Sequence, residues 1–303
     1  MRIVLHGQQA FGQAVLEKLL ERGEDVVAVC CAPTKEGKPE DVLASYAREK
    51  GLPVHQPASW KTPEALALME SFEADVCMMA YVLLFVPEAV LNAPKHGTFQ
   101  YHPSLCPLHR GPSSINWPIA MGKAHTGLSI FWPDDGLDEG PIMLQKTCAI
   151  GPDETLGDVY FKKLFPMGVD AMLEGLDLVK SGVIIKHDQR LESGTYEGWF
   201  GKNEAAIDWS LPVENVYNII RASNPAPGAW TTTAGKILNV YDCARVAGAG
   251  KAGDVVEINS EGIIVQAEGG RILIKRVKSD GEKVSAVDWA VTAGVTVGTK
   301  LGQ

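Results

Sequence analysis

The stretch MRIVLHGQQAFGQAVLEKLLERGEDVVAVCC, residues 1–31, decides the fold class of the chain. Two apolar runs, 3–6 and 26–31, flank a segment whose apolar residues recur with helical spacing, 10–22. A strand, a helix and a second strand in this order form one unit of a parallel sheet, which binds ligands at the carboxyl ends of its strands. We therefore expect an α/β domain built on a doubly wound, Rossmann-like sheet.

The alternation of strands and helices continues to about residue 150. Further strands are expected at 76–81, 98–101, 128–132 and 143–149, and helices at 39–50, 63–72 and 156–180. Asp153 or Thr155 is expected to cap the last helix, and Gly182 follows its end.

The alternation of strands and helices ends at a segment rich in Gly, Ser and aromatic residues, 193–203. A short helix is expected at 212–221. Short β-rich runs are expected after it at 237–241, 255–258, 262–267 and 271–277, and in a tail of Val, Thr and Gly. Several short strands at this spacing indicate a small barrel or sandwich. We predict a first domain at 1–203 and a β-rich, OB-like barrel domain at 204–303.

Composition excludes several classes of protein. The 303 residues are 46% hydrophobic and 21% charged, which rules out a disordered, collagen-like or coiled-coil chain. The longest apolar stretch, 76–86, is about half as long as a membrane helix, and the N-terminus does not resemble a signal peptide. Six cysteines without C-x-x-C spacing predict buried thiols and no zinc site. We expect a cytoplasmic protein.

The loop after the first strand resembles a dinucleotide-binding loop only in part. Gly7 and Gly12 are present, but Gln9 stands where the second glycine of G-x-G-x-x-G is required. A side chain there blocks close approach to a pyrophosphate. We therefore expect a plain strand-to-helix turn and no nicotinamide or flavin dinucleotide.

Two polar loops carry the candidate chemistry. QYHPSLCPLHRG, residues 100–111, places His102 at the end of an expected strand, and PDDGLDEGP, residues 133–141, follows another. We expect both loops at the ligand-binding edge of a parallel sheet. A histidine facing a carboxylate there can polarise a carbonyl oxygen while the acid orders a nucleophile. The alternative is a structural histidine and turn-forming aspartates.

The motif H-P-S-L-x-P-x-H-R-G followed by L-D-x-G resembles the folate-dependent formyltransferase superfamily. Further shared phrases are SINW (114–117), FWPDDGLDEG (131–140) and TYEG (195–198), and the resemblance runs from Met1 to about Trp230. It is closest to the N-terminal hydrolase domain of the 10-formyltetrahydrofolate dehydrogenases, and it extends to the methionyl-tRNA formyltransferases.

The resemblance implies that His102 and Asp138 are the catalytic pair. Gln100 stands where the formyltransferases carry Asn and the hydrolase domain carries an aliphatic residue. Its amide can donate to a developing oxyanion, so we count it as a third catalytic candidate. The alternative is a plain polar residue at the end of a strand.

The resemblance also implies a folate pocket between two loops. One side is the apolar loop of Tyr81, Val82, Leu83, Leu84 and Phe85, and the other is formed by Asp134, Asp135, Gly136 and Leu137. An apolar loop can sandwich a flat heterocycle, although without the resemblance residues 82–86 would be assigned to the core. The family further implies a cis peptide before Pro107, a structural Arg110 that bonds carbonyls or an acid, and a packing role for Cys106.

The activity implied is removal of the formyl group of 10-formyltetrahydrofolate, without a metal. We favour hydrolysis to tetrahydrofolate and formate; the alternative is transfer to an amine of a small molecule, such as an amino sugar, or of methionyl-tRNA. Net charge is −9, and residues 206–303 carry ten Lys/Arg and ten Asp/Glu, which disfavours tRNA. A non-catalytic folate-binding protein and a nicotinamide-dependent dehydrogenase are rival classes. We expect this chain not to oxidise the formyl group to carbon dioxide, because it carries no stretch assigned to the carrier and aldehyde-dehydrogenase portions of the dehydrogenases.

Overall fold

The computed structural model describes residues 1–279 and 281–302. Contacts divide these residues into two compact units. Unit 1 comprises Met1–Gly111, Gly127–Cys148 and Lys163–Tyr196; unit 2 comprises Pro112–Thr126, Ala149–Lys162 and Glu197–Gln303, of which the last residue is not described. The domain boundary near residue 204 stays a prediction.

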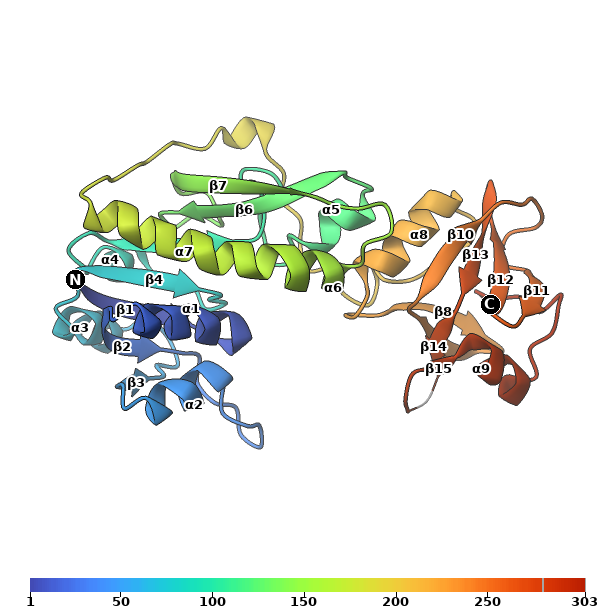
Figure 1. The fold of residues 1–303 in the computed structure, drawn as a ribbon, viewed down its shortest axis with the longest axis horizontal. Helices are drawn as coiled ribbons and strands as arrows, with labels where there is room; N and C mark the ends of the chain where they lie inside the picture. The colour runs from blue at the N-terminus through green and yellow to red at the C-terminus, as the bar shows by residue number, and fades with distance from the viewer. Residues whose placement is uncertain (280, 303) are drawn as a thin grey trace. The chain divides into compact units, whose positions relative to one another are not determined.

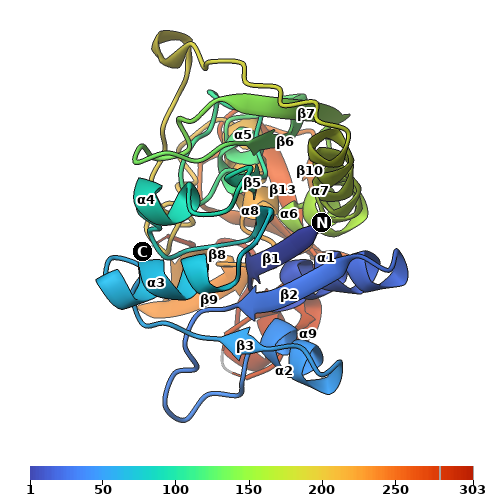
Figure 2. The ribbon, with the colours of Figure 1, turned by 90° about the vertical axis from the view of Figure 1, so that its left-hand side faces the viewer.

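A seven-stranded sheet in the order β3-β2-β1-β4-β5-β6-β7 forms the centre of unit 1 (Figure 2). Its strands are β1 (Arg2–Gly7), β2 (Asp25–Cys30), β3 (Val54–His55), β4 (Val76–Ala80), β5 (Thr98–His102), β6 (His125–Phe131) and β7 (Ile142–Ala149). The six expected strands are present, and β3 is an addition that was too short and too polar to recognise.

The sheet is mixed, which corrects one expectation. Strands β1 to β5 pair in parallel, but β6 runs antiparallel to β5, with His102 opposite Ser129 and Gln100 opposite Phe131. The two polar loops therefore do not leave the same edge of a parallel sheet. The loop after β6 starts at the level of the beginning of β5 and has to turn back to reach His102.

Helices cover both faces of this sheet because the strands are apolar on both sides. On one face, α1 (Gln9–Glu21), α2 (Val42–Glu49) and α7 (Phe165–Lys180) share a core with Ile3 and Leu5 of β1 (Figure 1). On the other, α3 (Pro63–Ser71) and α4 (Glu88–Leu91) share a core with Val4. Alternate residues of one strand thus serve two cores.

Where one helix was expected over 156–180, three consecutive elements occur: α6 (Leu156–Val159), a π-helical turn at Tyr160–Leu164, and α7. Thr155 caps α6 in a reciprocal capping box with Asp158, and Gly182 takes a φ of +74° beyond the end of α7. Pro166, which has no amide hydrogen, lies at the start of α7 and interrupts the regular helical bonding.

Unit 2 contains two four-stranded antiparallel sheets, in the orders β10-β13-β12-β11 and β15-β14-β9-β8. Their strands are β8 (Ala229–Thr233), β9 (Lys236–Val240), β10 (Cys243–Val246), β11 (Val255–Asn259), β12 (Gly262–Ala267), β13 (Gly270–Ile274), β14 (Arg276–Lys278) and β15 (Val284–Ser285). The single strand expected at 271–277 is therefore two strands, which lie in different sheets. The unit is β-rich, as expected.

The helices of unit 2 are α5 (Asn116–Ala120), α6, α8 (Val213–Ala222) and α9 (Ala286–Ala293). Helix α9 overturns the strand-like interpretation of the tail. Ser285 caps it through the amide of Asp288, and Gly294 ends it with a φ of +67°, so ordinary boundary signals flank it. No helix among residues 1–279 and 281–302 has the length and hydrophobicity to span a membrane.

Candidate active site

His102 ends strand β5 in a position fixed by the alternation of the strand. Phe99 and Tyr101 point into the core shared with α1 and α7, so Gln100 and His102 face the opposite side of the sheet. His102 is only 7% exposed, whereas Gln100 is half-buried. Gln100 and His102 therefore share one face of the sheet.

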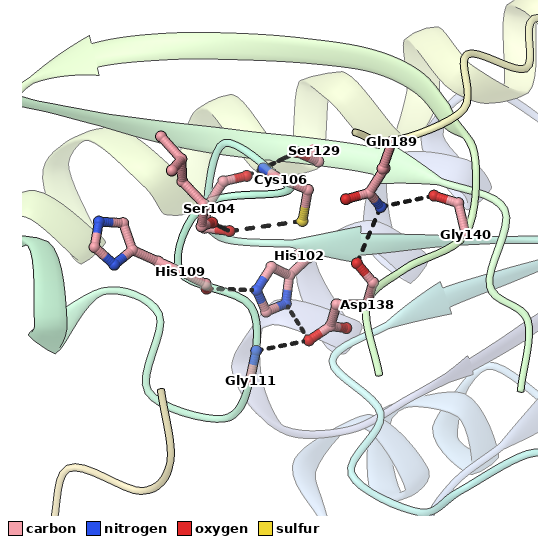
Figure 3. A network of polar contacts seen from close by, with 10 residues as sticks. His102, Ser104, Cys106, His109, Gly111, Ser129, Asp138, Gly140 and Gln189 are labelled. Atoms are coloured by element: carbon pink, nitrogen blue, oxygen red, sulfur yellow. Dashed lines mark hydrogen bonds and ion pairs between the residues drawn. The ribbon is translucent and has the colours of Figure 1, made fainter. Parts of the chain in front are cut away.

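The loop after His102 is folded by its own polar groups and by β6. The Ser104 hydroxyl donates to the carbonyl of Leu108 at 2.8 Å, and the amide of Cys106 donates to the Ser129 hydroxyl at 3.0 Å. The Cys106–Pro107 peptide is cis, as the resemblance implied. This path returns the chain so that the carbonyl oxygen of His109 lies 3.3 Å from Nε2 of His102 (Figure 3).

Asp138 meets the other side of the same imidazole. Its Oδ2 atom lies 3.6 Å from Nδ1 of His102 and accepts a hydrogen bond from the amide of Gly111 at 2.9 Å (Figure 3). Asp138 holds a left-handed backbone conformation, with a φ of +57°, which non-glycine residues seldom adopt. The loop at 133–140 thus turns back over the sheet and delivers one carboxylate to the histidine.

The two contacts of His102 define how its ring nitrogens are placed. A neutral imidazole has one N–H, and Nε2–H donating to the His109 carbonyl leaves Nδ1 facing the carboxylate of Asp138. An imidazole and a carboxylate this close together can divide the proton transfers of a reaction: the carboxylate accepts a proton from a nucleophile, and the imidazole donates to an oxyanion.

The other two aspartates of the loop have structural contacts. Asp134 accepts from the amide of Gly136 at 2.9 Å, which is a turn contact. Asp135 accepts from the amide of Glu88, the first residue of α4, at 3.0 Å. Asp135 therefore ties its loop to the segment that follows residues 81–87, so the two predicted pocket loops are neighbours. Leu137 is 59% exposed beside them.

Residues 81–87 alternate between core and surface. Val82, Leu84 and Val86 pack on the core beneath α3 and α4, as the alternative interpretation expected. Tyr81, Leu83 and Phe85 instead expose large apolar side chains, and Leu83 is 53% exposed.

The predicted pocket loop begins at Tyr81, whose φ is +66°. The tyrosine side chain is only partly exposed, and the burial of the rest raises the pKa of its phenol. The segment passes close to the glycine turn after β1, where a Cβ on Gly7 would clash with the carbonyl oxygen of Ala80. At that turn Gln9 takes a φ of +57°, and its amide donates to both carboxylate oxygens of Asp41 at 2.8 and 2.9 Å. A glutamine is thus accommodated where the fingerprint requires glycine.

The remaining residues of the motif are packing and bracing groups. Burial raises the pKa of the Cys106 thiol to about 11, so it is protonated at neutral pH and is no nucleophile. Arg110 forms an ion pair with Glu139, next to Asp138 in the loop. That pairing fits the structural role that was assigned to Arg110.

Two contacts come from residues to which the sequence analysis gave no role in the site. Gln189 donates from Nε2 to the carbonyl oxygens of Asp138 and Gly140, at 3.0 and 2.7 Å (Figure 3). The hydroxyl of Thr195 accepts from the amide of His109 at 2.8 Å. Thr195 belongs to the shared phrase TYEG, which was a usable signal. Gln189 lies in irregular chain with no periodicity to mark it.

The described residues include no group of three His, Cys, Asp or Glu side chains arranged to hold a metal ion. The polar groups around His102 are instead a carboxylate, a carbonyl and backbone amides. These donors and acceptors suit proton transfer and oxyanion stabilisation at a carbonyl carbon.

Comparisons with known proteins give one consistent result. The "Formyl transferase" family model matches residues 1–173, and the "Formyl transferase, C-terminal domain" model matches residues 200–293. The mitochondrial 10-formyltetrahydrofolate dehydrogenase of Mus musculus is 35% identical over 312 residues, covering 98% of this chain and 34% of that protein. The chain thus spans about a third of the dehydrogenases it matches.

Two further relatives match over nearly their whole length. The methionyl-tRNA formyltransferase of Geotalea uraniireducens is 32% identical over 309 residues, covering 100% of this chain and 98% of that protein. The N-formyltransferase of Helicobacter canadensis, solved with folinic acid and dTDP-3-aminofucose, has a TM-score of 0.67 at 16% identity, covering 90% of this chain and 98% of that one. At that identity the likeness concerns the fold alone.

Proposed function

Because this chain belongs to the formyl transferase family, we propose that it removes the formyl group of 10-formyltetrahydrofolate, and that water is the acceptor. The observation that carries the proposal is the contact of His102 with Asp138, at 3.6 Å between Nδ1 and Oδ2. Both groups are largely buried, which strengthens their electrostatic interaction with a bound substrate.

The folate is proposed to bind between the loops at 81–87 and 134–138. The exposed side chains of Tyr81, Leu83 and Phe85 supply apolar surface for the flat ring, and Leu137 supplies more from the opposite loop. The bond from the amide of Glu88 to Asp135 keeps the two loops adjacent. Covering these side chains with a ligand would remove apolar surface from water, which favours binding.

The reaction balances with water and this pair of residues. Asp138 accepts a proton as the water oxygen bonds to the formyl carbon, and the carbonyl π electrons move to oxygen. His102 donates from Nδ1 to stabilise the resulting oxyanion. When the carbon–N10 bond breaks, the oxyanion re-forms the carbonyl and N10 takes the proton from Asp138. Tetrahydrofolate leaves, and the formic acid gives its remaining proton to water and leaves as formate. No oxidant or reductant is required.

Gln100 is proposed as a second donor to the oxyanion. It lies two residues before His102 on the same face of β5, and no hydrogen bond in the described part of the chain occupies its side-chain amide. An amide N–H aimed at the developing charge would contribute in the manner of an oxyanion hole. The alternative role, a polar residue at the end of a strand, is tested by Gln100→Leu, which should lower kcat roughly tenfold or more if the donor is used.

An amine acceptor is the second candidate. This candidate is supported by the match of the chain over 98% of a methionyl-tRNA formyltransferase, a protein that is named for a transfer reaction. Among amines, tRNA is disfavoured because residues 206–303 balance ten basic against ten acidic residues, whereas a phosphate-binding surface needs excess positive charge. A small amine therefore ranks above tRNA. The cytoplasm remains the expected location; the relatives include proteins named as cytosolic and as mitochondrial.

The test is turnover of 10-formyltetrahydrofolate by the purified chain with no acceptor added. Formate and tetrahydrofolate should appear in equal amounts, and His102→Ala and Asp138→Ala should each slow their release by about 10²–10⁴-fold. Binding of the folate without release, followed by turnover when an amine is added, would replace hydrolysis by transfer. If the chain neither binds nor turns over the folate, the proposal is overturned altogether.

A further inference from the structure

The Asp138 backbone needs an external support. Its φ of +57° is unfavourable for a residue with a side chain, and the preceding residue, Leu137, is exposed. A conformation of this kind persists only where the surrounding contacts fix it. The carboxylate is bonded by the amide of Gly111, but that contact acts on the side chain and not on the backbone.

The backbone support comes from Gln189. The Nε2 atom of this side chain uses both of its hydrogens, one toward the carbonyl oxygen of Asp138 and one toward that of Gly140 (Figure 3). Gly140 lies directly against the carbonyl of Trp132, where a Cβ would clash, and the next residue, Pro141, accepts a hydrogen bond from the amide of Trp132 at 2.9 Å, which anchors the chain here. Gln189 therefore links the residue that carries the carboxylate to an anchored point of the same loop.

The oxygen of the Gln189 amide agrees with the donor role of its nitrogen. Its Oε1 atom is buried and has no hydrogen-bond partner among the described residues. A glutamine whose only bonds run from Nε2 to two carbonyls can act on the loop only as a donor. Glu139, between the two carbonyls, is held separately by Arg110.

We propose that Gln189 is a positioning residue for Asp138: it holds the left-handed backbone that aims the carboxylate at His102. The inference rests on the proposed function for its kinetic consequence, but its structural consequence is independent of any substrate. Without the amide, the peptide at Asp138 is free to leave the left-handed region, and the Oδ2 atom moves away from Nδ1 of His102 and from the amide of Gly111.

The chain offers a matched control in unit 2. Gln266 is buried, and its Nε2 atom also donates to two carbonyl oxygens, those of Ala267 and Gly270, each at 2.7 Å. Gln189→Leu and Gln266→Leu each remove two bonds from Nε2 to carbonyl oxygens, and leucine keeps most of the side-chain volume. Gln266→Leu is the harsher change, because Gln266 is more buried and its Oε1 atom also accepts a hydrogen bond from Nε of Arg271 at 3.0 Å. Only Gln189→Leu touches the loop of Asp138.

The first readout is hydrogen exchange of the Gly111 amide by NMR in the absence of substrate, because this amide is bonded to the Asp138 carboxylate. Gln189→Leu should accelerate its exchange at least tenfold, and Gln266→Leu should leave it unchanged. Equal protection of Gly111 in both variants would overturn the proposal. If Gln189→Leu does not fold, Gln189→Ala removes the same amide with a smaller side chain and takes its place.

The second readout is kinetic and uses 10-formyltetrahydrofolate. Gln189→Leu should lower kcat by roughly 10²-fold, as small displacements of catalytic groups do, with KM changed less than threefold. In the Asp138→Ala background the same substitution should cost less than twofold, since the group it positions is gone. A cost that is equal in both backgrounds would show a merely structural role.

The two readouts separate the two proposals. Faster exchange at Gly111 in a chain that never releases formate would keep the positioning role and reject the activity. Release of formate by the unmodified chain, with Gln189→Leu behaving like Gln266→Leu in both readouts, would keep the activity and reject the positioning role.

Discussion

The loop after His102 continues directly from the end of strand β5, whereas the loop that carries Asp138 reaches the histidine only after turning back from the end of β6. Ser104 closes the first loop locally, and Ser129, Gln145 and Thr195 bond it from other segments. The second is fixed by the amides of Glu88 and Gly111 and by the side chain of Gln189. The histidine is thus placed by a strand, and the aspartate by contacts that only the folded chain provides.

This difference explains why one half of the pair was easier to place from sequence. A residue at the end of a strand inherits its direction from the alternation of side chains. A residue in a loop after an antiparallel strand has no such rule, so its position depends on which groups fold over it. The predictions below test whether the two loops really differ in this way, in order of decreasing effect.

The largest effect is expected where the two loops meet. His102→Ala and Asp138→Asn should each lower kcat/KM by about 10²–10⁴-fold, because each removes a proton-transfer partner. The double variant should be scarcely slower than the worse single variant, as for groups that act as one unit. Additive losses measured in a steady-state double-mutant cycle would indicate two independent roles.

Cys106 tests the first loop through pH. Its pKa is raised to about 11 by burial, so the folded state keeps the proton after the unfolded state, with a pKa near 9, has lost it. Stability from this group is therefore fully present below pH 9 and is lost as pH rises toward 11. Cys106→Ala should flatten the pH dependence of the unfolding free energy in this window by about 2–3 kcal/mol.

Chemical denaturation at pH 8, 9, 10 and 11 measures this change. Other buried cysteines, such as Cys77 with a pKa raised to about 12, titrate in the same direction. The comparison is therefore between the slopes of the parent and of Cys106→Ala. Identical slopes would contradict the assigned protonation of Cys106.

Thr195 belongs to a distant segment that bonds the first loop at Pro107, His109 and Arg110. Thr195→Val leaves the amide of His109 without its acceptor, which should cost about 1–3 kcal/mol of unfolding free energy, whereas Thr195→Ser keeps the hydroxyl and should cost less. The carbonyl of His109 bonds His102, so the nitrogen chemical shifts of that imidazole should change in the Val variant alone. Unchanged shifts would separate Thr195 from the catalytic histidine.

The smallest effect is expected at Asp135. Asp135→Ala removes the acceptor for the first amide of α4, a contact of an exposed carboxylate that is worth about 0.5–2 kcal/mol. Thermal unfolding should show this loss, and titration with a folate analogue should show weaker binding because the two pocket loops are no longer tied. Asp208→Ala, which removes only local turn contacts with Ser210 outside the two pocket loops, is the control for the binding measurement.

Much of the architecture followed from the sequence because apolar runs and helical spacing are local signals. Strand β3 was missed because two residues carry no periodicity. Helix α9 was missed because Val and Thr are frequent over 284–299, although Ser285 and Gly294 within that range marked the boundaries of a helix. The predicted direction of β6 was wrong because an apolar run indicates a strand but not whether the strand pairs in parallel or antiparallel with its neighbour.

The site shows the same limit. The place of His102 and Gln100 at the end of a strand could be predicted from the motif and the apolar run that contains it. The cis peptide before Pro107 and the structural role of Arg110 were implied by the family resemblance. The resemblance named Asp138, but its path back to the histidine needed the folded loop. Gln189 gave no local signal, because a lone glutamine in irregular chain acquires its role only from what lies opposite it.

The central claim is that the His102–Asp138 pair directs water onto a formyl carbon. The most direct test is a single turnover of 10-formyltetrahydrofolate in ¹⁸O-labelled water, followed by mass spectrometry of the formate. The account predicts one labelled oxygen in each formate released by the parent chain and no labelled formate above background from Asp138→Asn. Formate that appears equally with both chains, or a formyl group found only on an added amine, would contradict it.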